Sequence, residues 1–198
     1  MIKFLNNCND LPYLMFREKY DHAYNQGQES IEAISISSYL KYSGEVNSRF
    51  VNLKFIDNKD FIFFTNYNSQ KSKEFKNHSQ ISALIYWNKT NVQIRIKSTI
   101  RETSAKYNND YFRQRSKEKN ALALSSQQSV PIDSYESVKK NFNKYLKKGN
   151  LNECPSYWGG YSFTPYYFEF WEGHKSRINR REVFSLENNK WKKFLLQP

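Results

Sequence analysis

The chain has 198 residues, which is enough for one domain with a sizeable hydrophobic core. Its 31 Lys and Arg residues outnumber 19 Asp and Glu residues, and the formal net charge of +12 favours anionic partners. Two cysteines without a C-x-x-C pair exclude a disulfide framework. With no apolar leader-like start and no apolar run of membrane-spanning length, we expect a cytoplasmic protein.

The first hundred residues predict one helix followed by sequential strands. Asp10 is a suitable N-cap, and alternation of Ile34 and Ile36 with serines is typical of a half-buried strand. The predicted elements are a helix to about Tyr24, a strand around 34–36, a turn at Ser43-Gly44, strands 49–56 (Val51, Leu53 and Phe55 on one face) and 61–65 joined by a turn at 57–60, a short helix from Ser69 to Lys76, and strands 81–87 and 92–103 joined by a turn at 88–91.

The second half predicts grouped helices and then further strands. The predicted elements are helices 104–115 and 118–124, a helix to about Lys147 that starts at the capping-box pattern Asp133-x-x-Glu136, a Trp-Gly-Gly loop, an extended stretch 163–171, and strands 182–186 and 191–196 flanking a turn at 187–189. Lys139, Lys140, Lys144, Lys147 and Lys148 are predicted to form an exposed helix face. Sequential hairpins with helices grouped apart predict a mainly β fold, an antiparallel barrel with peripheral helices, as one domain over 1–198.

The C-terminal segment holds the most informative cluster of residue types. It runs from Trp158-Gly159-Gly160-Tyr161 through Glu169–Gly173 to the basic run Arg177–Arg181. Glycine lets the backbone approach a ligand closely, tryptophan offers a flat apolar wall, and arginine offers a planar fork suited to phosphate. This segment therefore predicts a site for a flat, phosphorylated ligand.

Other candidates lie upstream. The segment Thr65–Lys71 leaves a strand and enters a helix, so it can form a phosphate cradle, although capped helices with nearby lysines are common. Arg49 and Lys54 are five apart and would face opposite sides of a regular strand, so one ligand could reach both only if the strand bends or the ligand lies at its end. Gln93 is either an outward-facing polar residue or an amide that addresses a heterocycle.

Tyr111, Arg115 and Lys119 recur at four-residue spacing, which would form one polar stripe on a continuous helix. The chain has no metal-ligand spacing, no nucleophile elbow, no P-loop and no G-x-G-x-x-G pattern. If the protein is an enzyme, we therefore expect a cofactor to supply the chemistry.

Several motifs resemble one known family when they are taken together in their order and spacing. They are Arg49-x-Val51-x-Leu53-Lys54, Phe63-Phe64-Thr65-Asn66-Tyr67-x-Ser69, Gln128-Ser129, Trp158-Gly159-Gly160-Tyr161 and Glu169-Phe170-Trp171. From about Pro12 to Pro198 the chain resembles the pyridoxamine/pyridoxine 5'-phosphate oxidases, flavoproteins of the split-barrel fold. The resemblance implies an FMN-binding homodimer with each flavin held between subunits, an N-terminal helical segment over 1–28 and a C-terminal family segment over 155–198.

The resemblance also implies roles for individual residues. Those expected at FMN are Arg49, Val51, Lys54, Phe64, Thr65, Ser69, Gln70, Lys71, Gln93, Gln128, Ser129, Trp171 and Arg181. Those expected at the substrate are Lys54, Tyr111, Arg115, Lys119, Arg177 and Asn179, with Arg177 and Asn179 at the reacting end. The implied reaction moves a hydride from pyridoxamine or pyridoxine 5'-phosphate to flavin, gives pyridoxal 5'-phosphate, and reduces O2 to hydrogen peroxide.

The sequence departs from the family pattern at positions that bear on function. Asn179 stands where the family has a histidine, Arg180 where it has an acid, Gln70 where it has an arginine, and Lys119 where it has a serine. Val92 and Ser162 each replace a family arginine. The alternatives are therefore a related flavin oxidoreductase with another planar substrate and a non-catalytic binder of FMN or pyridoxal phosphate. Nucleic-acid binding through the basic surface has no recognition motif to support it.

Overall fold

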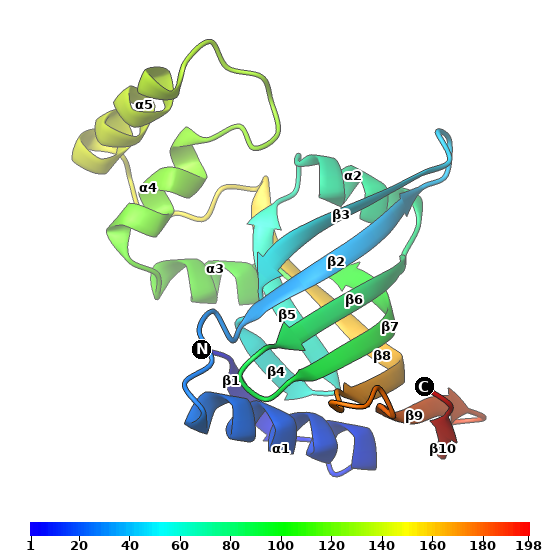
Figure 1. Ribbon diagram of the computed structural model, residues 1–198. Helices are drawn as coiled ribbons and strands as arrows, with labels where there is room; N and C mark the ends of the chain where they lie inside the picture. Colours follow the sequence, from blue (N-terminus) through cyan, green and yellow to red (C-terminus); the bar gives the residue numbers. More distant parts are fainter.

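Ten strands in one hydrogen-bonded sheet form the body of the protein in the computed structural model, which describes residues 1–198 except the side chain of Lys148. Five helices within this described part lie around the sheet (Figure 1). In chain order the elements are β1 (Lys3–Asn7), α1 (Leu11–Asn25), β2 (Ala33–Leu40), β3 (Glu45–Asn52), β4 (Phe55–Asn58), β5 (Asp60–Asn66), α2 (Gln70–Asn77), β6 (Gln80–Trp87), β7 (Val92–Glu102), α3 (Ala105–Arg113), α4 (Lys117–Ser125), α5 (Tyr135–Lys148), β8 (Trp158–Glu172), β9 (Arg180–Glu187) and β10 (Lys190–Leu196).

The sheet is almost wholly antiparallel, with the order β1-β4-β5-β8-β7-β6-β2-β3, and β9 and β10 continue from β8. It curls strongly, with α1 across its lower end, α2 at its upper end and α3 to α5 along one flank (Figure 1). The predicted class, a mainly β barrel with peripheral helices, is confirmed. The exception in direction is β1, which pairs parallel with β4 and was not predicted. Its sequence is short and largely exposed, so only pairing with β4 makes it a strand.

The core follows from strict alternation along the strands. In β6 every second residue is buried, and in β2 and β7 the inward positions include Ile34, Ile36, Ile94 and Ile96, all fully buried. Because successive side chains of a strand point to opposite faces, this alternation places one apolar face inside the curled sheet. Each buried aliphatic or aromatic side chain contributes about 1.5–3 kcal/mol.

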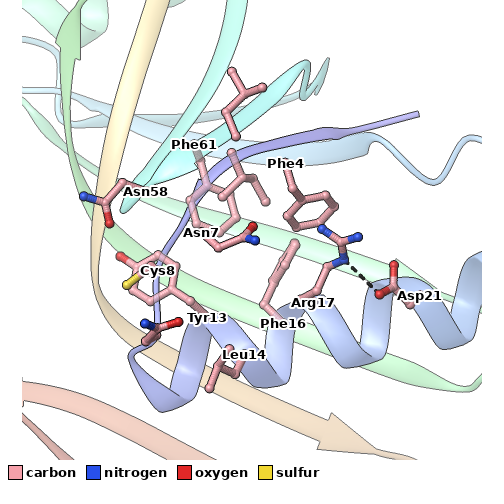
Figure 2. A pocket seen from close by; sticks show the side chains of 13 residues that line it. Phe4, Asn7, Cys8, Tyr13, Leu14, Phe16, Arg17, Asp21, Asn58 and Phe61 are labelled. Atoms are coloured by element: carbon pink, nitrogen blue, oxygen red, sulfur yellow. Dashed lines mark hydrogen bonds and ion pairs between the residues drawn. The ribbon is translucent and has the colours of Figure 1, made fainter.

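The helix α1 closes one end of the barrel with aromatic side chains. Tyr13, Phe16 and Tyr20 fall on one face, and the Phe16 ring lies 5.1 Å from that of Phe61 in an edge-on contact. Figure 2 shows Tyr13 and Phe16 directed from α1 toward β1 and the sheet, and both line a cavity of about 370 Å³. The Arg17 guanidinium covers the Phe4 ring at 4.0 Å and pairs with Asp21 at 2.8 Å.

The predicted strand 49–56 is wrong in one respect, because it is two strands separated at Leu53 and Lys54. Up to Asn52 the chain pairs with β2, whereas from Phe55 it pairs with β5. Leu53 is fully buried and its N–H donates to the Glu32 carbonyl at 2.9 Å. The bend that a shared site for Arg49 and Lys54 would need is therefore present.

Three further expectations are corrected. Trp158-Gly159-Gly160 is not a loop, since β8 begins at Trp158 and pairs with β5 from there. The cap of α5 is Ser134, not Asp133, and its side chain accepts from the Ser137 N–H. The first of the two helices predicted after Thr103 ends at Arg113 rather than at Arg115, and Ser116 caps α4 as a separate helix, so Tyr111, Arg115 and Lys119 do not lie on one continuous helix.

The other predicted helices and strands are confirmed to within a few residues. The predicted lysine face of α5 is exposed at Lys139, Lys140, Lys144 and Lys147, while the side chain of Lys148 lies outside the described part. Over the described residues, every helix is too short or too polar to cross a membrane.

Candidate active site

A cavity of about 290 Å³ lies where the end of β3, β5, α2, α3, α4 and the start of β8 meet. Most of its lining comes from residues that the sequence singled out. The lining residues are Phe50, Val51, Asn52, Lys54, Phe64, Thr65, Lys71, Tyr111, Arg115, Lys119, Gln128 and Trp158. The strand bend at Leu53 brings Lys54 here, and the break between α3 and α4 lets Tyr111, Arg115 and Lys119 face one space without a continuous helix.

The cavity is strongly cationic. Lys54, Lys71, Arg115 and Lys119 line it, and none of the described residues that line it is acidic. Positive groups gathered without counter-charges repel one another unless an anion joins them. This arrangement therefore suits a ligand that carries phosphate or carboxylate.

Lys71 is the buried last residue of the segment Thr65–Lys71, the candidate phosphate cradle identified from the sequence. Its side chain is 8% exposed, and its Nζ donates to Thr65 Oγ1 and Ser69 Oγ, both at 3.1 Å. Burial, reinforced by the nearby Arg49 charge, lowers the Lys71 pKa to about 8. A buried ammonium that meets only hydroxyl oxygens is well prepared to receive an anionic oxygen.

The Arg115 guanidinium makes a cation–π contact with Trp158, with its Cζ 4.3 Å from the ring centroid. Its Nη2 donates to the Lys119 carbonyl at 3.1 Å, whereas the buried Nη1 has no hydrogen-bond partner among the described residues. Burial lowers the pKa of this guanidinium. A buried donor without a partner costs about 1–3 kcal/mol, so this nitrogen is an open position for a ligand oxygen.

Lys54 belongs to the same electrostatic group. Burial lowers its pKa, and repulsion from Lys119 and Arg115 acts in the same direction against the opposing effect of Glu32. An anion bound among Lys54, Arg115 and Lys119 would therefore reduce the repulsion between their positive charges.

Stacked aromatic rings form the apolar wall of the cavity. The Phe64 and Tyr111 centroids are 3.9 Å apart at an interplanar angle of 25°, and Phe64 lies 5.2 Å from Trp158 at 11°. Parallel rings of this kind offer a surface for a flat heterocycle.

The segment that follows α4 is hydrogen-bonded to the end of β5 and the start of α2. Gln128 Oε1 accepts from Thr65 Oγ1 at 3.0 Å, and Ser129 Oγ accepts from the Gln70 N–H at 3.5 Å. That N–H is the first of α2, where the positive end of the helix dipole lies. Ser69 is the N-cap residue of α2, as predicted, but its hydroxyl bonds Ser72 and Lys71 rather than the helix backbone.

Arg49 does not line this cavity. Its guanidinium pairs with Glu74 at 2.6 Å and donates to Ser38 Oγ at 2.5 Å. Glu74 is fully buried and also accepts from Asn47 and Gln70. Arg49 therefore acts on the cavity through its charge beside Lys71, and the residue that neutralises it was missed from the sequence.

A second group of predicted residues lies elsewhere on the sheet. Gln93, Trp171 and Arg181 are directly opposite one another across β7, β8 and β9, so they share a face. Trp158 of the cavity and Trp171 stand near opposite ends of β8, and Gln93, Trp171 and Arg181 are all absent from the lining of the cavity. Within one chain the two groups are not brought together.

Arg181 is oriented by a buried carboxylate. Glu169 is 2% exposed, and its Oε1 accepts from Arg181 Nε at 2.9 Å and Nη2 at 2.8 Å. Its other oxygen accepts from Arg95 at 2.9 Å. Two charge-assisted hydrogen bonds from the Arg181 guanidinium to one carboxylate oxygen thus orient the guanidinium beside Trp171.

Arg177 and Asn179 stand in the loop between β8 and β9, on the side of this second group. Arg177 is exposed and adopts a positive φ of 62°. The Asn179 side chain accepts the His174 N–H at 3.0 Å, so it closes the loop. Within one chain, the Asn179 amide thus stabilises the loop in which it lies.

The two glycines of the Trp-Gly-Gly sequence serve packing within the protein rather than approach to a ligand. A Cβ on Gly159 would lie 2.2 Å from the Tyr67 hydroxyl, and one on Gly160 would lie 2.6 Å from Thr103 Oγ1. The interpretation of these glycines as ligand contacts is therefore wrong. Trp158 itself does form a wall of the cavity, as expected.

Phe50 and Asn52 line the cavity and were missed. Phe50 is 74% exposed on the outward face of β3, and a large exposed aromatic residue in an alternating strand was the available signal. For Asn52 no local pattern marked it, since its place depends on where β3 ends. Among the described residues, no three His, Cys, Asp or Glu side chains gather as a metal site would require.

The curled antiparallel sheet and its cationic, aromatic-walled cavity define a split-barrel protein. Comparison with family models gives two matches: residues 21–148 match "Pyridoxamine 5'-phosphate oxidase", and residues 158–198 match "Pyridoxine 5'-phosphate oxidase C-terminal dimerisation region". The chain belongs to the pyridoxamine 5'-phosphate oxidase family and is an oxidoreductase, as the sequence motifs predicted.

Individual relatives agree with this assignment. The pyridoxine/pyridoxamine 5'-phosphate oxidase of Colwellia psychrerythraea is 33% identical over 97% of this chain and 89% of its own. The protein of that name from Leptospira interrogans is 30% identical over 94% of this chain and 88% of its own. Among solved structures, PhzG from Burkholderia lata 383, in complex with tetrahydrophenazine-1-carboxylic acid, has a TM-score of 0.89 at 26% identity and covers 94% of this chain and 92% of that one.

Proposed function

We propose that the protein is an FMN-dependent oxidase that converts pyridoxamine or pyridoxine 5'-phosphate to pyridoxal 5'-phosphate, with O2 reduced to hydrogen peroxide; with the amine, water is consumed and ammonia is released. The observation that carries this proposal is the cavity in which Lys54, Lys119 and the unpartnered Arg115 Nη1 meet the stacked rings of Tyr111 and Phe64. Cations beside parallel aromatic surfaces match a flat ring that bears a phosphate.

The residues present fit the cofactor of this family. Lys71, Thr65, Ser69, Gln128 and Ser129 would hold the FMN phosphate at the start of α2, because they combine a buried ammonium, hydroxyl and amide donors and a helix N-terminus. Arg49 would add charge from behind, and Val51 and Phe64 would supply apolar contact. Bound FMN would supply the two-electron acceptor for the substrate.

The ring end of the flavin would be met by Gln93, Trp171 and Arg181 of a second copy. The outward face of the sheet supports such a pairing, because Phe50, Ser35, Leu84, Arg95 and Glu169 form one continuous row across β3, β2, β6, β7 and β8. Phe50 and Leu84 are exposed large apolar residues on this row, and Phe50 also borders the cavity. A partner seated on this face would reach the cavity of the first copy. The match of residues 158–198 to a dimerisation region agrees with that arrangement.

The protein's own part in the reaction is binding and orientation. Arg115, Lys54 and Lys119 would hold the substrate phosphate, and Tyr111 would pack on its ring. Arg177 and Asn179, from the loop beside the second group, would face the reacting end in the dimer. Since Asn179 is an amide, it can orient the substrate by hydrogen bonding but cannot gain or lose a proton there.

The decisive test is anaerobic mixing of flavin-loaded protein with pyridoxamine 5'-phosphate while the visible absorption of the flavin is recorded. We expect the absorption to bleach and to recover when air is admitted, with one hydrogen peroxide formed for each pyridoxal 5'-phosphate. An unchanged spectrum in fully loaded protein would reject the assigned substrate.

A second candidate is an oxidoreductase of this family that acts on another planar anion. It is favoured by Asn179, whose side chain closes its own loop, and by the likeness to PhzG, whose structure holds a tricyclic carboxylic acid. Flavin bleaching by a planar carboxylic acid, at a rate well above that with pyridoxamine 5'-phosphate, would favour this candidate.

For either candidate we propose that residues 1–198 act as one domain.

A further inference from the structure

A set of hydrogen-bonded polar groups, half-buried or buried, lies close to Trp158 but outside the lining of the cavity. We call it the polar clasp: the side chains of Tyr67, Thr103 and Asn108 together with the backbone of Gly160. Asn108 Nδ2 donates to the Tyr67 hydroxyl at 3.0 Å, and that hydroxyl donates to the Gly160 carbonyl at 3.0 Å. Asn108 Oδ1 accepts from the Gly160 N–H at 2.8 Å and from Thr103 Oγ1 at 2.5 Å.

The clasp permits one arrangement of its members. Asn108 is 5% exposed and uses both ends of its amide, so turning it would leave buried donors and acceptors without partners at a cost of about 1–3 kcal/mol each. Close packing reinforces this restriction. The absent Cβ atoms of Gly159 and Gly160 leave the space that Tyr67, Asn108 and Thr103 fill.

The clasp joins the two halves of the cavity. Asn108 lies on α3 one turn before Tyr111, and Arg115 follows directly after the helix, with its N–H donating to the Phe112 carbonyl at 3.2 Å. Tyr67 lies between Thr65 and Lys71 in the segment that carries the phosphate cradle. Asn108 therefore ties α3 to the segment of that cradle by hydrogen bonds, although Asn108 does not line the cavity.

We propose that Asn108 is a positioning residue for substrate binding: through the polar clasp it holds α3 so that Tyr111 and Arg115 face the substrate ring and phosphate. The proposal rests on the proposed function for the identity of the ligand. It assigns no chemical step to Asn108. Its consequence is that loss of the clasp weakens substrate binding while the rate of the bound complex is nearly kept.

The test uses the flavin-loaded dimer with the variants Asn108→Ala and Tyr67→Phe, and with Asn109→Ala as the matched control. Asn109 is the next residue of α3, but its side chain bonds only the Ala105 carbonyl of its own helix, at 2.9 Å, within the contacts described. The dissociation constant of pyridoxal 5'-phosphate is measured by equilibrium dialysis, and KM and kcat are measured with pyridoxamine 5'-phosphate.

We expect Asn108→Ala to raise the dissociation constant and KM about tenfold, which corresponds to about 1.4 kcal/mol of binding free energy. The kcat should stay within about twofold of the wild-type value, and the flavin content should stay full. Tyr67→Phe should shift both constants in the same direction, and Asn109→Ala should change neither. Unchanged constants in Asn108→Ala, or a fall in kcat without a change in KM, would overturn the proposal. If Asn108→Ala does not fold, Tyr67→Phe decides, and wild-type binding in that variant overturns it.

Failure of the proposed function is recognised separately. Wild-type protein that binds pyridoxal 5'-phosphate but shows no oxidation would reject the oxidase activity, and dialysis would still decide on the clasp. Wild-type protein that binds no pyridoxal 5'-phosphate would overturn both.

Discussion

Lys71 illustrates how single residues prepare the cavity for an anion. The sequence placed it beside a helix N-terminus, but only the fold buries it next to Arg49 with hydroxyl partners. Arg115 is similar, since its spacing suggested a surface stripe whereas the structure stacks it on Trp158 with one nitrogen left open. At this scale the cost of burying cations is what makes the site selective for anions.

If Lys71 binds the FMN phosphate as proposed, we expect the affinity for FMN to depend on pH. Its folded pKa, lowered to about 8, lies below its ordinary value of 10.5, so between these values the unfolded chain binds the proton that the folded chain has lost. This group therefore adds stability to the flavin-free protein as pH rises from about 8, while the affinity for a phosphate dianion falls. Titration of FMN binding between pH 7 and 10 should show weakening above about pH 8. Lys71→Met should bind FMN more weakly and with a flatter profile, and a steep profile in that variant would contradict the assignment.

Arg115→Lys should impair substrate binding selectively. A lysine keeps the charge but loses the planar fork and the stack on Trp158. We expect KM for pyridoxamine 5'-phosphate to rise about ten- to a hundredfold, in line with the 1.5–3 kcal/mol of a charged hydrogen bond. Arg113→Lys, an exposed position at the end of α3, serves as the control. Equal KM values for both variants would argue against a phosphate at Arg115.

At the scale of elements, interruptions shape the site more than regular stretches do. The separation of β3 from β4 at Leu53 turns Lys54 into the cavity, and the break between α3 and α4 lets Arg115 and Lys119 converge. β8 carries Trp158 at one end and Trp171 at the other, so it links the two groups of site residues.

Gly159→Ala should destabilise the start of β8. The added Cβ would stand 2.2 Å from the Tyr67 hydroxyl and 2.4 Å from Asn108 Nδ2, so the clasp would have to move. Overpacking of this kind costs about 1–3 kcal/mol, which thermal unfolding would report as a lower Tm. Gly44→Ala controls for the loss of a glycine alone. Gly44 has a positive φ of 74° but no neighbour within 4 Å, so only the cost of a left-handed backbone, about 1–2 kcal/mol, is expected. A smaller loss for Gly159→Ala than for Gly44→Ala would refute the packing argument.

At the scale of the whole molecule, the separation of the two residue groups is the main finding. Cations and aromatic rings gather at the edge of the sheet, while Gln93, Trp171 and Arg181 line up across β7, β8 and β9. We propose that each group is a partial site. A second copy seated on the outward face of the sheet would complete each of them.

Leu84→Glu should separate the copies and release the flavin. Leu84 is 39% exposed on the outward row and does not line the cavity, so a charge there would act on the interface and not on the ligand. We expect a smaller particle by analytical ultracentrifugation and loss of bound FMN in the same variant. Leu11→Glu, at the exposed first residue of α1, should leave both unchanged. Monomeric Leu84→Glu that retains FMN would show that the site is complete within one chain.

The sequence by itself determined the order of nearly all strands and helices and most lining residues of the cavity. Local rules suffice for these, since alternation, turn residues and motif spacing are properties of neighbouring positions. Only the tertiary structure decided that Glu74 neutralises Arg49, that Gly159 and Gly160 make room for Tyr67 and Asn108, and that β1 is a strand. These features join residues that lie far apart in the chain or pack by volume and burial, and no local pattern records either quantity.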